Sequence, residues 1–165
     1  MQHRLFYLRL TPILFAAMLV AAMLVGAAIV PMAPQARAQS GPQLTFVITG
    51  LRTNTGTVRG GIYSSAAVWT EVGGQVAVCT SRVAGGTSRC TLTAPGPGRY
   101  AFAFYHDADD DHQLNRDMVG IPQEGYGFSN NAHPGMGAPS FESAAFDVAA
   151  APYTSRIAAL YGWSM

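Results

Sequence analysis

Short segments in which apolar and polar side chains alternate constrain the fold of this chain more than any other feature. Leu44, Phe46 and Ile48 alternate with Thr45 and Thr49, which is the period of a strand with one buried face. Similar segments follow, and glycine, proline and asparagine residues separate them. After residue 38 the sequence contains no long helical period bounded by capping residues, so the pattern predicts an all-β fold.

The alternating segments predict an antiparallel β-sandwich. About seven short strands separated by turns are typical of such a fold, of the immunoglobulin-like or transthyretin-like type. Residues 106–140 are longer than an ordinary turn, and their apolar side chains predict an ordered loop packed on the sheets. The predicted strands cover residues 44–51, 57–64, 75–80, 89–93, 99–105, 141–148 and 154–161.

The N-terminal residues have the pattern of a secretory signal peptide. Basic residues precede the uncharged apolar run 13–30, and Ala36-Arg37-Ala38 then provides a cleavage site of small residues. An uncleaved membrane anchor is the alternative, because the run approaches the length that crosses a bilayer. We expect residues 1–38 to be removed. The remaining residues, 39–165, would form one periplasmic or secreted bacterial domain that has no membrane segment.

The charge of the expected mature chain excludes an ordinary nucleic-acid-binding protein. Residues 39–165 contain seven arginines and no lysine against nine acidic residues, so the net charge is −2. Proteins that bind nucleic acids through the phosphate backbone present a basic surface, which this composition does not provide.

Cys79 and Cys90 are the two cysteines of the chain. In an exported protein such a pair predicts a disulfide, and the absence of C-x-x-C spacing argues against a redox-active one. Residues 75–80 and 89–93 have strand patterns, and a pair of glycines lies between them. We therefore predict a hairpin in which Cys79 lies opposite Cys90.

The most informative segment follows the predicted strand 99–105 and contains five aspartates. Its first aspartates alternate as the first three ligands of an EF-hand-type loop do, and later positions offer a backbone carbonyl and an amide oxygen. Such oxygen ligands favour Ca²⁺ over Mg²⁺, which requires a tighter octahedron. The candidate metal ligands are Asp107, Asp109, Asp111, Gln113, Asn115 and Asp117.

Two departures from the EF-hand pattern keep other interpretations open. His112 stands where the pattern has a glycine, and Met118 stands where it has a bidentate glutamate, which Asp117 would have to replace. A solvated turn is the alternative, because aspartate is common in turns. Against it, four carboxylates within five residues repel one another unless a positive charge lies among them, and Arg116 supplies only part of that charge.

Three histidines offer zinc as a second alternative, namely His106, His112 and His133. Zinc requires three or four ligands in tetrahedral geometry. His106 and Asp107 would point to opposite faces of a continuing strand, so they are poor partners. We expect His106 to cap the aromatic face of Phe104 at the sheet edge.

Other side chains carry weaker functional interpretations. Glu124 and Glu142 could form a carboxylate pair for glycoside hydrolysis, but we expect surface acids. Trp69, Tyr126 and Phe128 could stack on a carbohydrate, but we expect them to be packing residues. The sequence contains no G-x-S-x-G elbow, P-loop or dinucleotide-binding motif.

Three segments resemble a bacterial family of exported proteins called domain of unknown function 2141. They are Pro97-Gly98-Arg99-Tyr100-Ala101, His106-Asp107 and the run GIPQEGYGFSNN from Gly120 to Asn131. The family pattern is P-G-x-Y-A, then H-D-x-N-x-N-G-x-L-D-x-N, then G-I-P-x-E-G-Y-G-F-S-N-N. The resemblance covers nearly all of residues 39–165 and implies an exported β-sandwich-like domain without an assigned reaction.

The chain departs from the family pattern within the acidic loop. Asp109 and Asp111 replace asparagines, His112 replaces the glycine, and Asn115 and Asp117 exchange the usual Asp and Asn. Oxygen ligands remain at these positions, so the loop is still compatible with a metal site. The additional charge would change the affinity for a metal ion, and the loss of the glycine disfavours a tight turn.

Three functional hypotheses follow. The first is a non-enzymatic periplasmic module that is stabilised by a disulfide and by Ca²⁺ and acts in binding or envelope organisation, with an envelope protein or glycan as partner. The second is a metal-assisted hydrolase that uses the loop carboxylates and His106. The third is a structural domain without a ligand. An enzyme should have carboxylates and a histidine converging on open space, whereas a structural calcium site should be a closed oxygen cage.

Overall fold

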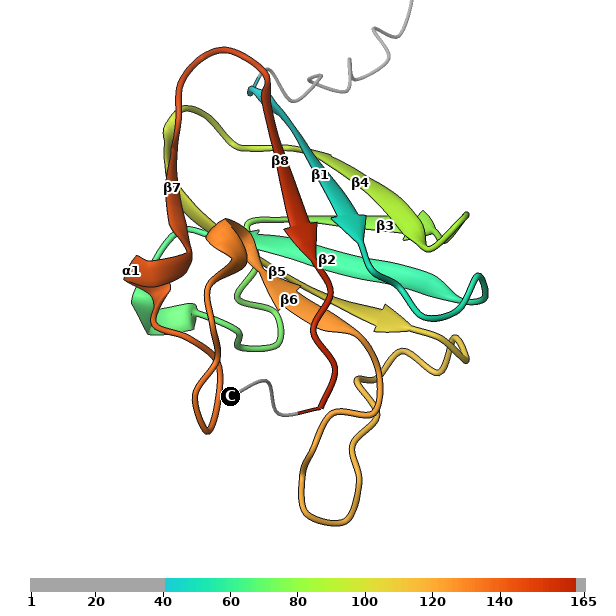
Figure 1. Ribbon diagram of the computed structural model, residues 1–165. Coiled ribbons are helices and arrows are strands. Elements are labelled where there is room, and N and C mark those ends of the chain that lie inside the picture. The colour runs from blue at the N-terminus through green and yellow to red at the C-terminus, as the bar shows by residue number, and fades with distance from the viewer. Residues whose placement is uncertain (1–40, 163–165) are drawn as a thin grey trace, which may run out of the picture. The chain divides into compact units, whose positions relative to one another are not determined.

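A computed structural model describes residues 41–162, which form two β-sheets packed face to face (Figure 1). The first sheet has the order β4-β1-β8, and the second has the order β3-β2-β5-β6, with β7 also paired to β5. The described residues contain eight strands: β1 (Gln43–Thr49), β2 (Thr57–Tyr63), β3 (Ala77–Arg82), β4 (Thr87–Thr93), β5 (Gly98–Asp107), β6 (Tyr126–Phe128), β7 (Ala145–Val148) and β8 (Tyr153–Ala158).

The predicted sandwich class is confirmed, and each predicted strand overlaps an observed one. The ladders are antiparallel except that β1 and β8 run parallel. Two details of the prediction are wrong. The three-residue strand β6 was not predicted. The first half of the predicted strand 141–148 is instead the short helix α1 (Phe141–Ala144). The side chain of its N-cap residue, Ser140, accepts a hydrogen bond from the Ser143 backbone N–H. The predicted signal peptide lies outside the described residues.

Aromatic side chains from both sheets fill the core between them. Phe46 of β1 stacks on Phe102 of β5, with their ring centroids 3.8 Å apart. Gly60 of β2 lies against the Phe102 ring, because a Cβ atom there would be 2.5 Å from it. The absence of a side chain at Gly60 therefore lets β2 approach the aromatic core closely. Among the described residues no helix is long and apolar enough to span a membrane.

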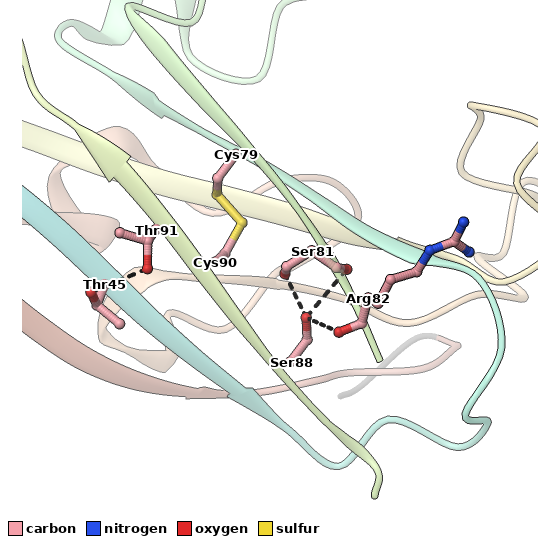
Figure 2. The surroundings of a disulfide bond; sticks show 7 residues. All are labelled: Thr45, Cys79, Ser81, Arg82, Ser88, Cys90 and Thr91. Atoms are coloured by element: carbon pink, nitrogen blue, oxygen red, sulfur yellow. Dashed lines mark hydrogen bonds between the residues drawn. A yellow bond between two sulfur atoms is a disulfide. The ribbon is translucent and has the colours of Figure 1, made fainter. Parts of the chain in front are cut away.

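The Cys79–Cys90 disulfide is present, but it does not lie within a hairpin of one sheet. Cys79 is in β3, which pairs with β2, whereas Cys90 is in β4, which pairs with β1. The bond therefore joins the edge strand of one sheet to the edge strand of the other, as Figure 2 shows. The Ser81 and Ser88 hydroxyls, 2.6 Å apart, add a second link between these strands. The predicted hairpin was wrong because its two strands separate into different layers beyond a tight turn at Ala84.

Ser129 fills a gap in the second sheet, where β5 changes its neighbour. The β5 residue Ala101 pairs with β7 and Ala103 pairs with β6, so Phe102 between them faces neither strand. The Ser129 hydroxyl accepts a hydrogen bond from the Phe102 backbone N–H at 2.8 Å and lies 2.5 Å from the Ala144 carbonyl oxygen, to which it donates. Because this hydroxyl is fully buried, its removal leaves buried backbone groups without partners.

Ser129→Ala is therefore expected to lower the free energy of unfolding by about 2 kcal/mol, measured by urea denaturation. Ser65→Ala provides the control, because Ser65 is exposed and makes no capping hydrogen bond through its side chain. Equal losses in the two variants would contradict this role for the Ser129 hydroxyl.

Candidate metal site

Asp107, the last residue of β5, is fully buried at the base of the acidic loop. Its Oδ2 accepts hydrogen bonds from Arg59 Nε at 2.6 Å and from the His112 backbone N–H at 3.1 Å. Its Oδ1 is the one buried side-chain nitrogen or oxygen among the described residues that has no hydrogen-bond partner. A buried carboxylate oxygen without a partner is costly, and a bound cation is one way to satisfy it.

Asp109 and Glu124 bring two more carboxylates to Asp107. One oxygen of each of the three side chains lies within 4.8 Å of the others, and this acidic triad can hold a metal ion. Asp109 is exposed, whereas Asp107 and Glu124 are buried. Three carboxylates and a single contacting arginine leave an excess of negative charge, which a cation would offset.

Glu124 also fixes the path of the loop. Its Oε1 accepts a hydrogen bond from the Ala108 backbone N–H at 2.7 Å, and its Oε2 accepts one from the Asn115 backbone N–H at 3.0 Å. One side chain thus connects the first residue after β5 with a residue in the middle of the loop. The Glu124 carboxylate therefore orders the loop in addition to belonging to the triad.

The other sequence-predicted ligands lie outside the triad. Asp111 Oδ1 accepts a hydrogen bond from the Gln113 backbone N–H, and Asn115 Nδ2 donates one to Asp109 Oδ2. Asp117 Oδ1 accepts from the backbone of residues 119 and 121 and so stabilises a separate turn. Of the four aspartates among the six candidates, the structure brings together Asp107 and Asp109, and it adds Glu124, which is not the surface acid expected from the sequence.

The loop makes its tight turn without the glycine of the family pattern. Asp110 and His112 have positive φ angles of 59° and 70°, a left-handed conformation that glycine adopts most readily. Aspartate and histidine adopt it more often than most other residues do. The substitution of His112 for glycine has therefore left the turn in place.

The three candidate zinc ligands do not come together. His106 is 2 % exposed, and its Nε2 lies 2.9 Å from the Thr55 carbonyl oxygen, so the ring is part of the interior rather than a cap at the sheet edge. His112 and His133 are exposed. Among the described residues no histidine belongs to a group with metal-binding geometry.

Trp69 is a packing residue, as expected. Its ring lies against Tyr63, Phe128 and Phe141, with the Tyr63 centroid 5.1 Å away. Its Nε1 donates a hydrogen bond to the Pro139 carbonyl at 2.7 Å. Glu142 is exposed and forms an ion pair with Arg99 on the surface, so it does not form a pair with Glu124.

Arg59 provides the positive charge next to the triad. Its hydrogen bond to Asp107 raises the pKa of the guanidinium above its already high value, so the side chain remains charged. Desolvation also raises the pKa of the neighbouring Tyr105 hydroxyl, which donates a hydrogen bond to the His112 carbonyl in its neutral form. The wall beside the triad is thus cationic at Arg59 and neutral at Tyr105.

No curated protein and no solved structure matches the chain. A family model does match residues 46–156, a segment that extends from the start of the sandwich into β8 and includes the whole acidic loop. This match covers more than half of the chain and agrees with the resemblance seen in the sequence motifs. The chain therefore belongs to the family described as uncharacterized protein conserved in bacteria (DUF2141).

Proposed function

We propose that this protein is an exported, non-enzymatic β-sandwich module that binds Ca²⁺ at Asp107, Asp109 and Glu124 and acts in binding or envelope organisation. The observation that carries the proposal is the unpartnered Oδ1 atom of the fully buried Asp107, because a cation at the triad would supply its missing partner. The signal-peptide pattern and the disulfide support an extracytoplasmic location, where disulfides persist.

The chemistry of the triad favours Ca²⁺ over other ions. All three groups offer carboxylate oxygens, and the absence of histidine and cysteine from the triad argues against zinc. Calcium accepts six to eight oxygens at about 2.3–2.6 Å, so two oxygens on opposite sides of the ion are about 5 Å apart. The separation of up to 4.8 Å within the triad fits this sphere, and the exposed side of Asp109 leaves room for water ligands.

The alternative hypothesis, a metal-assisted hydrolase, has less support than a calcium-binding module. The histidine proposed for that role, His106, is buried with its Nε2 against the Thr55 carbonyl, so it does not face open space with the carboxylates.

Calcium titration of the purified protein by calorimetry tests the proposal. We expect saturable binding with one ion per chain, and stabilisation by about 2.7 kcal/mol when free Ca²⁺ is 100 times the Kd. Asp109→Asn should weaken the binding strongly while leaving the fold intact in EDTA, because Asp109 is exposed and its removal costs little packing. Glu124→Gln should also weaken binding, with an additional loss of loop order.

Asp110→Asn is the matched control. Asp110 lies beside Asp109 in the same exposed loop, but it pairs with Arg82 and is not part of the triad. If Asp110→Asn weakens calcium binding as much as Asp109→Asn, the affinity for calcium depends only on the total negative charge of the loop and not on the triad. If the unmodified protein gives neither heat nor a shift in melting temperature, the calcium proposal is wrong.

A further inference from the structure

A groove of about 860 Å³ lies on the outer face of the second sheet, on the side away from the core. Small residues form its floor, because Gly61 of β2 and Ala103 of β5 are paired neighbours on that face. The walls come from Tyr105 and from the segments 112–122 and 134–138. A groove of this volume is large enough to hold a small organic molecule. We refer to it as the outer groove.

Exposed apolar side chains are concentrated in the outer groove. Six large apolar residues among the described part of the chain are exposed, and three of them, Val72, Val78 and Met136, line this groove. Val72 is 101 % exposed and Met136 is 92 % exposed, so neither packs on the domain itself. Apolar surface that gathers in a concave site and remains uncovered marks a place where another molecule binds.

The permanently charged side chains that line the outer groove are both arginines. Arg59 and Arg116 line it, and no aspartate or glutamate does, although acidic residues outnumber arginines after residue 38. Arg59 uses only Nε to contact Asp107. Its terminal nitrogens Nη1 and Nη2 donate no hydrogen bond to any residue that the structure describes, so they are free to bind an acidic group.

We propose that the outer groove binds an amphipathic organic anion, with its acidic group on Arg59 and its apolar part against Val78 and Met136. An apolar ligand fits better than a carbohydrate, because the strongly exposed apolar lining is aliphatic. The rings of Tyr126 and Phe128, which could stack on a sugar, are more than nine-tenths buried. This proposal does not require a bound calcium ion, because none of the carboxylates of the acidic triad lines the groove. Arg59 is the one contact between the two sites, since its Nε also pairs with Asp107.

Titration with 8-anilinonaphthalene-1-sulfonate, an amphipathic anion whose fluorescence rises in apolar sites, tests the proposal. It is done in EDTA, so that a failure of the calcium proposal does not affect the result. We expect saturable binding to the purified protein with one site per chain. Arg59→Gln should weaken binding at least about tenfold, a factor that corresponds to about 1.4 kcal/mol. Arg89→Gln, which removes an exposed arginine of β4 outside the groove, should leave it unchanged.

Two further measurements keep the test valid if Arg59→Gln does not fold. Ala103→Leu places a larger side chain on the groove floor and should also weaken dye binding at least tenfold. On the unmodified protein, octanoate should displace the dye at a concentration at least tenfold lower than 1-octanol, which has the same chain without the charge. If octanoate and 1-octanol displace the dye at equal concentrations, the proposal is wrong. It is also wrong if folded Arg59→Gln or Ala103→Leu binds the dye with the affinity of the unmodified protein.

Discussion

Replacing both Cys79 and Cys90 with alanine is expected to lower the free energy of unfolding by about 3 kcal/mol. The two cysteines are 11 residues apart, and the bond removes the entropy that this loop would have in the unfolded chain. Because the bond joins β3 to β4, it also holds together two sheets that share no hydrogen-bonded ladder at this point. Urea denaturation should show the loss, and the melting temperature should fall by roughly 10 °C.

Reduction of the unmodified protein provides the control for this experiment. Dithiothreitol should destabilise the wild-type protein by nearly the same amount, whereas it should have no effect on the double variant. Both side chains are buried, so a difference between the reduced protein and the variant measures the packing of the two sulfur atoms. A double variant within 1 kcal/mol of the oxidised protein would show that the bond contributes little to stability.

The sequence predicted the sandwich because burial on one face decides the pattern of a strand. Leu44, Phe46 and Ile48 are fully buried, and their alternation is visible without a structure. The pairing of strands is not visible in the same way. The patterns of β3 and β4 fit a hairpin, but β3 pairs with the preceding strand β2, and β4 pairs with the more distant strand β1. Elements of three or four residues, such as β6 and α1, are too short to give any period.

The acidic loop was recognised from local spacing, and that is also why Glu124 was missed. Asp107 ends β5 and Asp109 follows two residues later in the loop, so both carboxylates lie near one point of the chain. Glu124 lies well beyond them in the sequence and reaches them only because the loop folds back on itself. The signal that could have identified it is a lone acid within the run of glycine and aromatic residues that precedes Ser129.

Gly56→Ala is expected to lower the free energy of unfolding by about 2–4 kcal/mol and to weaken calcium binding. Gly56 has a φ of +71°, and a Cβ atom there would lie 2.0 Å from the Asp107 carbonyl oxygen and 2.6 Å from Ala108 Cα. The left-handed conformation costs an alanine about 1–2 kcal/mol, and relieving the clash adds a cost of similar size. The clash falls on the backbone at the start of the acidic loop, so the loop must move away from the position that brings Asp107 and Asp109 together. Urea denaturation in EDTA and calcium calorimetry measure the two effects separately.

Gly73→Ala separates the clash from the backbone conformation. Gly73 has a similar φ of +82°, but a Cβ atom there would meet nothing within 4 Å. The free energy of unfolding of Gly73→Ala should therefore fall by only about 1–2 kcal/mol, and the variant should bind calcium as the unmodified protein does. If the two alanine variants are destabilised equally, contact with the Asp107 backbone is unimportant. Gly56→Ala could also be destabilised more than Gly73→Ala and still bind calcium with normal affinity. In that case the position of the loop backbone does not determine the affinity of the site. The side chains of the triad would then reach the ion from a displaced loop as well.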